Sequence, residues 1–159
     1  MSMQAYLFNE GSISFALDSF NDLTVNTFVF EYDEKLSMNI MITRDKLVSG
    51  EDISAYVTRQ IGVLGKNIKN HKISSRLPAT LGSGKGAIQG EVIEATQKNG
   101  GKTFHQRQAG FPLPAPFVGR ALVFSVTQDK PFSESFNKSW NLLLESFKLR
   151  TRSEVSGDA

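Results

Sequence analysis

The amino-acid sequence predicts an α+β domain, in which an antiparallel β-sheet packs against two main helices. Three observations predict this class. Most segments alternate their side chains with the two-residue period of a strand. Two segments instead repeat apolar residues at steps of three and four, which is the period of an amphipathic helix. Short clusters of Gly, Asn, Asp and Pro separate the segments, as is typical of turns between strands.

The first part of the chain predicts two pairs of strands. Asn9-Glu10-Gly11 is a short turn signal, so the segments on either side of it are expected to form a hairpin. Tyr32-Asp33-Glu34-Lys35 is a polar turn between the next two strands. The expected strands cover residues 4–8, 12–17, 24–31 and 37–43.

Residues 51–69 predict the first helix. Ser49, followed three residues later by Asp52, predicts a capping box at its start. Gly62 and Gly65 are poor helix formers, although they allow another backbone to approach closely. The apolar stripe of the helix consists of Ile53, Val57, Ile61, Leu64 and Ile68.

The rest of the chain predicts four more strands and a second helix. Gly82-Ser83-Gly84 and Asn99-Gly100-Gly101 mark turns between the strands. The helix is expected to begin near Pro131, because proline is favoured in a first helical turn. Its apolar stripe consists of Phe132, Phe136, Trp140, Leu143 and Phe147. The strands are expected over residues 72–81, 86–97, 102–109 and 116–127.

Length and composition limit the class of protein. The 159 residues predict a single domain over residues 1–149, followed by a polar tail over residues 150–159 that is expected to be disordered. The absence of cysteine excludes disulfides, thiolate metal sites and a cysteine nucleophile. A net charge of +2 is too balanced for a nucleic-acid-binding surface. We recognise no signal peptide and no membrane-spanning run, so we expect a cytoplasmic protein that does not insert into membranes.

The two faces of the predicted strands differ in side-chain size. On one face aromatic residues such as Phe28, Phe30 and Phe124 are expected to form the core beneath the helices. The other face carries small, β-branched or thioether side chains, such as Val25, Thr27 and Met41, and few charges. Either each helix covers one face, or both helices pack on one face and leave the other as a hydrophobic surface. Such a surface would need a partner, because monomers rarely expose large apolar patches.

Two glutamines interrupt these apolar patterns. Gln60 projects from the apolar stripe of the first helix, and Gln108 lies in a strand. A buried amide without a hydrogen bond costs about 1–3 kcal/mol, so each is either bonded to a nearby group, placed at the margin of the stripe, or available to a partner.

The sequence contains few motifs that are typical of catalytic or ligand-binding sites. Gly82-Ser83-Gly84-Lys85-Gly86 lacks the first glycine and the Ser or Thr of a phosphate-binding loop, and is better interpreted as a hairpin turn. Glu91 and Glu94 point to opposite strand faces and cannot form a carboxylate pair. The sequence has no Gly-x-Ser-x-Gly motif, which would supply a serine nucleophile for His71 or His105 to activate. We therefore expect no enzyme and no cofactor or metal, and keep a small hydrolase using His71 or His105 as the less favoured alternative.

Three local motifs and the order of elements carry a family resemblance. The motifs are Thr24-Val25-Asn26-Thr27-Phe28, Ile40-Met41-Ile42-Thr43-Arg44-Asp45 and Tyr56-Val57-Thr58-Arg59-Gln60, and the helix around Trp140 also fits. Over residues 5–149 the chain resembles the Eag chaperones of type VI secretion, a group within the DcrB-like family whose fold is related to Mog1 and PsbP.

The resemblance implies a specific function. Eag chaperones are homodimers that shield the apolar N-terminal transmembrane helices of large secreted effectors, often of the Rhs class, before these are loaded on the secretion spike. The client-binding positions fall on Val25, Thr27, Met41, Gln60 and Gln108. Thr27 departs from the larger aliphatic residue of the family, and Gln106 would share the strand face of Gln108. A Mog1- or PsbP-like module that binds a soluble partner is the other alternative.

Overall fold

The computed structural model describes residues 3–16, 23–33 and 36–150 and confirms the α+β class, with antiparallel sheets and two main helices. The chain divides into two compact units: Met1–Leu23 with Leu149–Ala159, and Thr24–Lys148. The single domain over residues 1–149 stays a prediction. Most of the polar tail expected over residues 150–159 lies outside the described residues. Within the described residues, no helix is long and apolar enough to cross a membrane.

The first unit contains the predicted hairpin. Strands β1 (Gln4–Phe8) and β2 (Gly11–Phe15) pair antiparallel, with Tyr6 opposite Ile13. The turn at Asn9 and Glu10 joins them, as the sequence predicts. A two-stranded hairpin buries little apolar surface by itself, which is why Leu7 and Ile13 are about half exposed.

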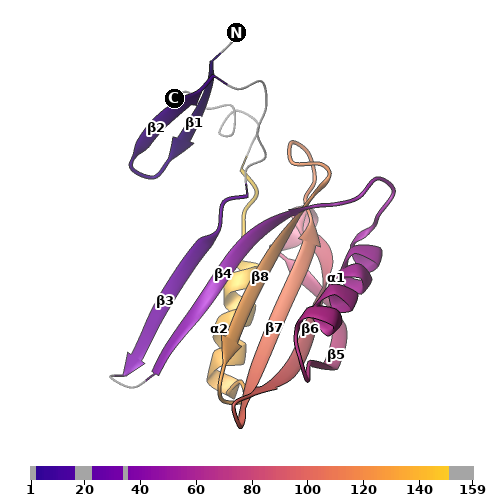
Figure 1. Cartoon of the computed structure of the whole chain (residues 1–159). Helices are drawn as coiled ribbons and strands as arrows, with labels where there is room; N and C mark the ends of the chain where they lie inside the picture. The colour runs from indigo at the N-terminus through magenta and orange to yellow at the C-terminus, as the bar shows by residue number, and fades with distance from the viewer. Residues whose placement is uncertain (1–2, 17–22, 34–35, 151–159) are drawn as a thin grey trace. The chain divides into compact units, whose positions relative to one another are not determined.

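The second unit is a six-stranded antiparallel sheet with the strand order β3-β4-β8-β7-β6-β5 (Figure 1). The predicted turns at Gly82 and Gly100 each connect neighbouring strands. The strand bounds are β3 Asn26–Asp33, β4 Leu36–Lys46, β5 Lys72–Leu81, β6 Ile88–Asn99, β7 Lys102–Pro112 and β8 Arg120–Gln128.

The two helices cover opposite faces of this sheet, which decides between the two arrangements left open by the sequence (Figure 1). Helix α1 (Ile53–Asn67) packs its Tyr56 and Val57 into one cluster with Ala121 of β8. Helix α2 (Glu134–Glu145) packs into a second cluster with the next residue along β8, Leu122. Because neighbouring strand residues point to opposite faces, the clusters lie on the two sides of the sheet.

The start of α1 differs from the expected capping box. The N-cap is Asp52, whose Oδ1 accepts a hydrogen bond of 2.8 Å from the amide of Ala55. The prediction that placed Ser49 at the cap is therefore wrong. The polypeptide turns first, with the amide of Glu51 bonded to the carbonyl of Val48, and the helix begins only at Ile53.

The aromatic core is smaller than predicted. Phe124, Phe136 and Trp140 are buried between the sheet and α2, as expected. Phe28 and Phe30 were also expected beneath the helices, but they are 46% and 41% exposed. They lie on β3, one of the two edge strands of this sheet, and a single helix on this face leaves them only partly covered.

Candidate functional site

The candidate site lies on the face of the sheet that α1 covers in part, and it extends from α1 across β7, β8 and β4 to β3. Helix α1 packs over β6 and β7. Beyond it, the strand register places Thr27 opposite Met41, Met41 opposite Ser125, and Ser125 opposite Gln108. Three of the five predicted site residues therefore lie in one row across four neighbouring strands, on the same face. We call this surface, with Val25 and Val29, the α1-side face.

The side chains at the β3 end of the α1-side face are exposed although they are apolar. Val25, Val29 and Met41 are 48%, 60% and 37% exposed. Thr27, between the two valines, is exposed as well. No bulky aromatic residue stands in the row, so the surface is shallow and gives a partner close access to the strand backbone.

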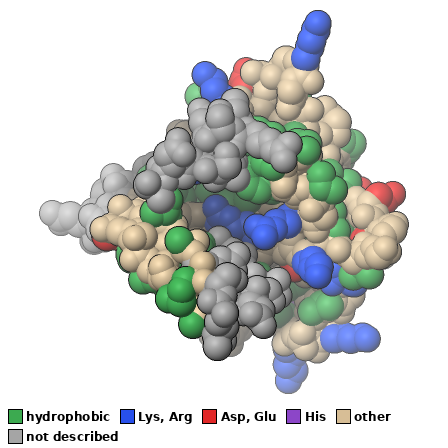
Figure 2. Space-filling model, turned by 90° about the horizontal axis from the view of Figure 1, so that it is seen from above, with side chains coloured by type: hydrophobic (Ala, Val, Ile, Leu, Met, Phe, Trp, Pro, Cys, Tyr) green, Lys and Arg blue, Asp and Glu red, His purple; other side chains and the backbone are tan. Residues whose placement is uncertain are grey.

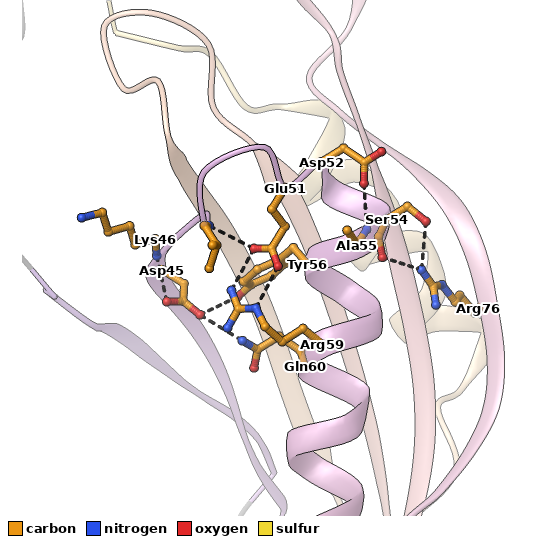
Figure 3. Close-up of polar contacts among 11 residues, drawn as sticks. Asp45, Lys46, Glu51, Asp52, Ser54, Ala55, Tyr56, Arg59, Gln60 and Arg76 are labelled. Atoms are coloured by element: carbon orange, nitrogen blue, oxygen red, sulfur yellow. Dashed lines mark hydrogen bonds and ion pairs between the residues drawn. The ribbon is translucent and has the colours of Figure 1, made fainter.

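A polar cluster borders this face where β4 approaches α1 (Figure 3). The Asp45 Oδ2 accepts hydrogen bonds from the Tyr56 hydroxyl at 2.8 Å and from the Gln60 Nε2 at 3.2 Å. Burial, followed by this bond to Asp45, raises the pKa of the Tyr56 hydroxyl above its usual value. The phenol therefore stays protonated and acts as a hydrogen-bond donor at neutral pH.

The two predicted amides line one cavity of about 250 Å3 together with Asp45, Tyr56 and Val123. Gln60 is half-buried, and its amide nitrogen is already bonded to Asp45. Gln108 is half-buried too, but in the described part of the chain its side chain has no hydrogen-bond partner. Of the two, Gln108 is thus the amide with its full hydrogen-bonding capacity available.

Gln106, the other candidate for the strand amide, lies two residues from Gln108 on the same face of β7. Its Oε1 is buried and has no partner among the described residues. Its neighbours across the strands are Ala95 and Thr127. Strand β7 therefore brings two incompletely bonded amides to the α1-side face.

An ion pair fixes the start of α1, and hydrogen bonds from β5 contact its first turn. Glu51 and Arg59 are joined by hydrogen bonds of 2.8 and 2.9 Å, and the Arg59 guanidinium lies over the Tyr56 ring at 5.3 Å from its centroid (Figure 3). The bond to Arg59 lowers the pKa of the Glu51 carboxyl, and the bond to Glu51 raises the pKa of Arg59. On the other side of α1, Arg76 bonds to Ser54.

The residues considered for catalysis are not gathered at this face. Glu91 pairs with Arg76 and Glu94 pairs with Arg107, on opposite faces, so the two carboxylates are separated as predicted. His105 lies on β7 on the side that faces α2, opposite Gln128. His71 precedes β5, and its Nε2 is buried without a partner among the described residues. No group of three metal-binding side chains occurs within the described ranges.

Sequence reasoning missed Asp45 and Tyr56 as members of the site. Tyr56 looks like one more residue of the apolar stripe, and the contact between Asp45 and Gln60 joins residues that are 15 positions apart. The one local signal is the spacing of Tyr56 and Gln60, which places both side chains on one side of the helix.

The chain is similar to a known protein family and to a solved structure. A family model described as DcrB matches residues 10–146. The crystal structure of PA94, a protein of unknown function from Pseudomonas aeruginosa that is suggested to be a regulator, matches with a TM-score of 0.69 and 17% sequence identity, over 94% of this chain and 98% of that one. At this identity the likeness establishes the fold alone. A search of the curated proteins finds no match.

Proposed function

The chain belongs to the DcrB family, and from this premise we propose that it is an Eag-type chaperone of type VI secretion. It binds the apolar N-terminal helices of a secreted effector, of the Rhs class, in the cytoplasm. By covering these helices it keeps them from aggregating or entering a membrane before the effector is loaded on the secretion spike. The protein acts as a homodimer and carries out no chemistry of its own.

The observation that carries the proposal is the group of exposed apolar side chains at the β3 end of the α1-side face. Val25, Val29 and Met41 are 48%, 60% and 37% exposed, and contiguous exposed apolar side chains are typical of a surface that binds a partner. Helices that normally pack inside membranes associate through close approach of small side chains. A shallow surface of Val, Thr, Met and Ser suits such a helix better than a surface of large aromatic rings.

The side-chain amide of Gln108 can form hydrogen bonds with a client bound to this surface. An apolar helix taken out of the membrane has few hydrogen-bonding groups, and those it has are costly to leave unpaired. Gln108 has no partner in the described chain and lies in the same cross-strand row as Met41. Its amide is therefore placed to donate to, and accept from, a loosened backbone group or a small polar side chain of the client.

A binding module of the Mog1 or PsbP kind, which engages a soluble partner, is the second candidate. The Asp45, Tyr56 and Gln60 cluster favours it, because a polar border of this kind also suits a folded protein surface. The two candidates differ in the client: a chaperone recognises an isolated apolar helix, whereas a module of this second kind requires a folded partner.

Coexpression tests the proposal. The chain is produced together with the apolar N-terminal segment of an Rhs-class effector, and the soluble fraction of that segment is compared with the fraction obtained without the chain. We expect a several-fold gain in soluble segment and a complex that copurifies. Failure of both would refute the chaperone, whereas copurification with the folded effector lacking its apolar segment would favour the second candidate.

A further inference from the structure

The α2-side face holds an apolar cavity that the proposed client-binding face does not use. It has a volume of about 420 Å3 and lies between the β3–β4–β8 part of the sheet and the C-terminal end of α2. This size falls in the range of small-molecule sites, about 300–1,000 Å3. Its walls include Phe28, Phe30, Ile42, Phe124, Leu143 and Phe147.

One cation, Arg44, lines this cavity, and its other lining residues are apolar except for Ser146. Its Nη1 donates to the Thr24 carbonyl at 3.0 Å and to the Asn26 Oδ1 at 2.6 Å, so the guanidinium is held in position by neutral oxygens. No carboxylate pairs with Arg44 among the described residues. The Nε and Nη2 donors have no acceptor there either. A fixed, half-buried guanidinium with free donors is suited to bind a carboxylate through two hydrogen bonds.

Further positive charge lies at the same end of the sheet. Lys46 stands opposite Arg120 in the register of β4 and β8, two positions beyond Arg44 along β4. Neither cation belongs to an ion pair in the described part of the chain. Figure 2 shows several Lys and Arg side chains next to hydrophobic side chains on the upper surface. This local field favours an anion at the Arg44 end of the cavity.

From the cavity and its single cation we infer that the α2-side face binds a free medium-chain carboxylate. The aliphatic tail lies against Phe28, Phe30 and Phe147, and the carboxylate accepts hydrogen bonds from Nε and Nη2 of Arg44. The ligand covers aromatic side chains that the fold leaves nearly half exposed. The inference is independent of the proposed chaperone function, because the cavity lies on the opposite side of the sheet from Met41 and Gln108.

Calorimetric titration of the full chain with decanoate tests the inference. We expect one decanoate bound per chain, with binding weakened about tenfold or more when decanol replaces it, since decanol lacks the charge. Butyrate, which lacks the tail, should not bind measurably. Equal affinity for decyltrimethylammonium would overturn the inference, because it would show that the tail alone binds, without recognition of the anion.

Substitutions in the cavity test which residues bind decanoate. Arg44→Met should weaken decanoate binding about tenfold or more, and Lys102→Met, which changes an exposed cation at the far end of β7, should leave it unchanged. Phe30→Ser is the second variant, for the case in which Arg44→Met does not fold. Because the Phe30 side chain is half-exposed, this variant should fold, and it should also weaken decanoate binding. Unchanged binding in the folded variants overturns the inference.

A second copy of the chain seated in the cavity would also overturn it. Light scattering would detect this as a dimer that Phe30→Asp dissociates.

Discussion

Gln60 and Gln108 line the same cavity but differ in their partners, and this difference separates a structural role from a binding role. Gln108 has no hydrogen-bond partner among the described residues, so Gln108→Leu should leave the free energy of unfolding unchanged to within about 0.5 kcal/mol. If Gln108 serves the client, the same change should weaken client binding about fivefold or more. Urea unfolding and a pull-down titration with the client segment measure the two effects.

Gln60→Leu is the matched comparison for this prediction. Gln60 donates to Asp45, so its loss should lower the free energy of unfolding by about 1 kcal/mol as well as weaken client binding. If Gln108→Leu destabilises the protein as much as Gln60→Leu and leaves the client affinity unchanged, the strand amide is a structural group.

Tyr56 provides a pH-dependent signal within the site. Burial and the bond to Asp45 raise the pKa of its hydroxyl above the usual 10.0. The folded state therefore holds this proton more tightly than the unfolded state, and its contribution to stability is complete below about pH 10 and is lost as the pH rises. Absorbance of tyrosinate should show a component in the folded protein that is still un-ionised near pH 11.

The Tyr56→Phe variant identifies that component. It should lack the late-ionising absorbance and should unfold with a free energy lowered by about 1 kcal/mol at neutral pH, because Asp45 loses a donor. A late component that persists in Tyr56→Phe would show that another tyrosine, and not Tyr56, ionises late.

At the level of single residues, the sequence could predict Gln60 because a polar side chain in an apolar stripe is a local irregularity. It could also place Val25 and Thr27 on the same face, since alternation within one strand is local. It could not predict the partner of Gln60. Asp45 ends a strand and Gln60 lies on a helix, and only the path of the chain through the turn at Val48 brings their side chains together.

Gly90 lies where β6 and β7 pack closely. It is buried on β6, where a Cβ would run into the carbonyl oxygen of Gly110 and lie 2.5 Å from the Phe111 ring. Gly90→Ala should therefore force β6 and β7 apart and lower the free energy of unfolding by about 1–3 kcal/mol, measured by urea unfolding.

Gly62 is the matched control for Gly90. It lies on α1 with open space around its Cβ position, so Gly62→Ala should raise the free energy of unfolding by about 0.5–1 kcal/mol through helix propensity. If Gly90→Ala is as well tolerated as Gly62→Ala, then β6 and β7 do not pack as closely as described.

At the level of elements, the strand predicted over residues 72–81 matches β5 at both ends, and the turn signal at Gly82 marks where it stops. The exposure of Phe28 and Phe30 was not predictable, because alternation tells which side chains share a face and not whether a helix covers it. Their strand lies at the edge of the sheet, and edge position follows from the strand order, which depends on contacts between distant segments.

For the molecule as a whole, the decisive arrangement is one helix on each face of the sheet. The sequence left this open, since the apolar stripes of both helices would fit either face. With α1 placed over β6 and β7, Val25, Val29 and Met41 on β3 and β4 stay exposed. The proposed function depends on these side chains forming a binding surface for an apolar helix.

The measurement that tests this claim most directly is the affinity for the client segment of a variant that carries Val25→Asp and Met41→Asp. Both side chains are exposed, so the variant should fold with an unchanged melting temperature. We expect that it no longer binds the segment. The control Val118→Asp with Leu142→Asp places two charges at exposed apolar positions outside the α1-side face and should bind like the wild type. Full binding by the folded Val25→Asp, Met41→Asp variant would show that the α1-side face does not bind the client.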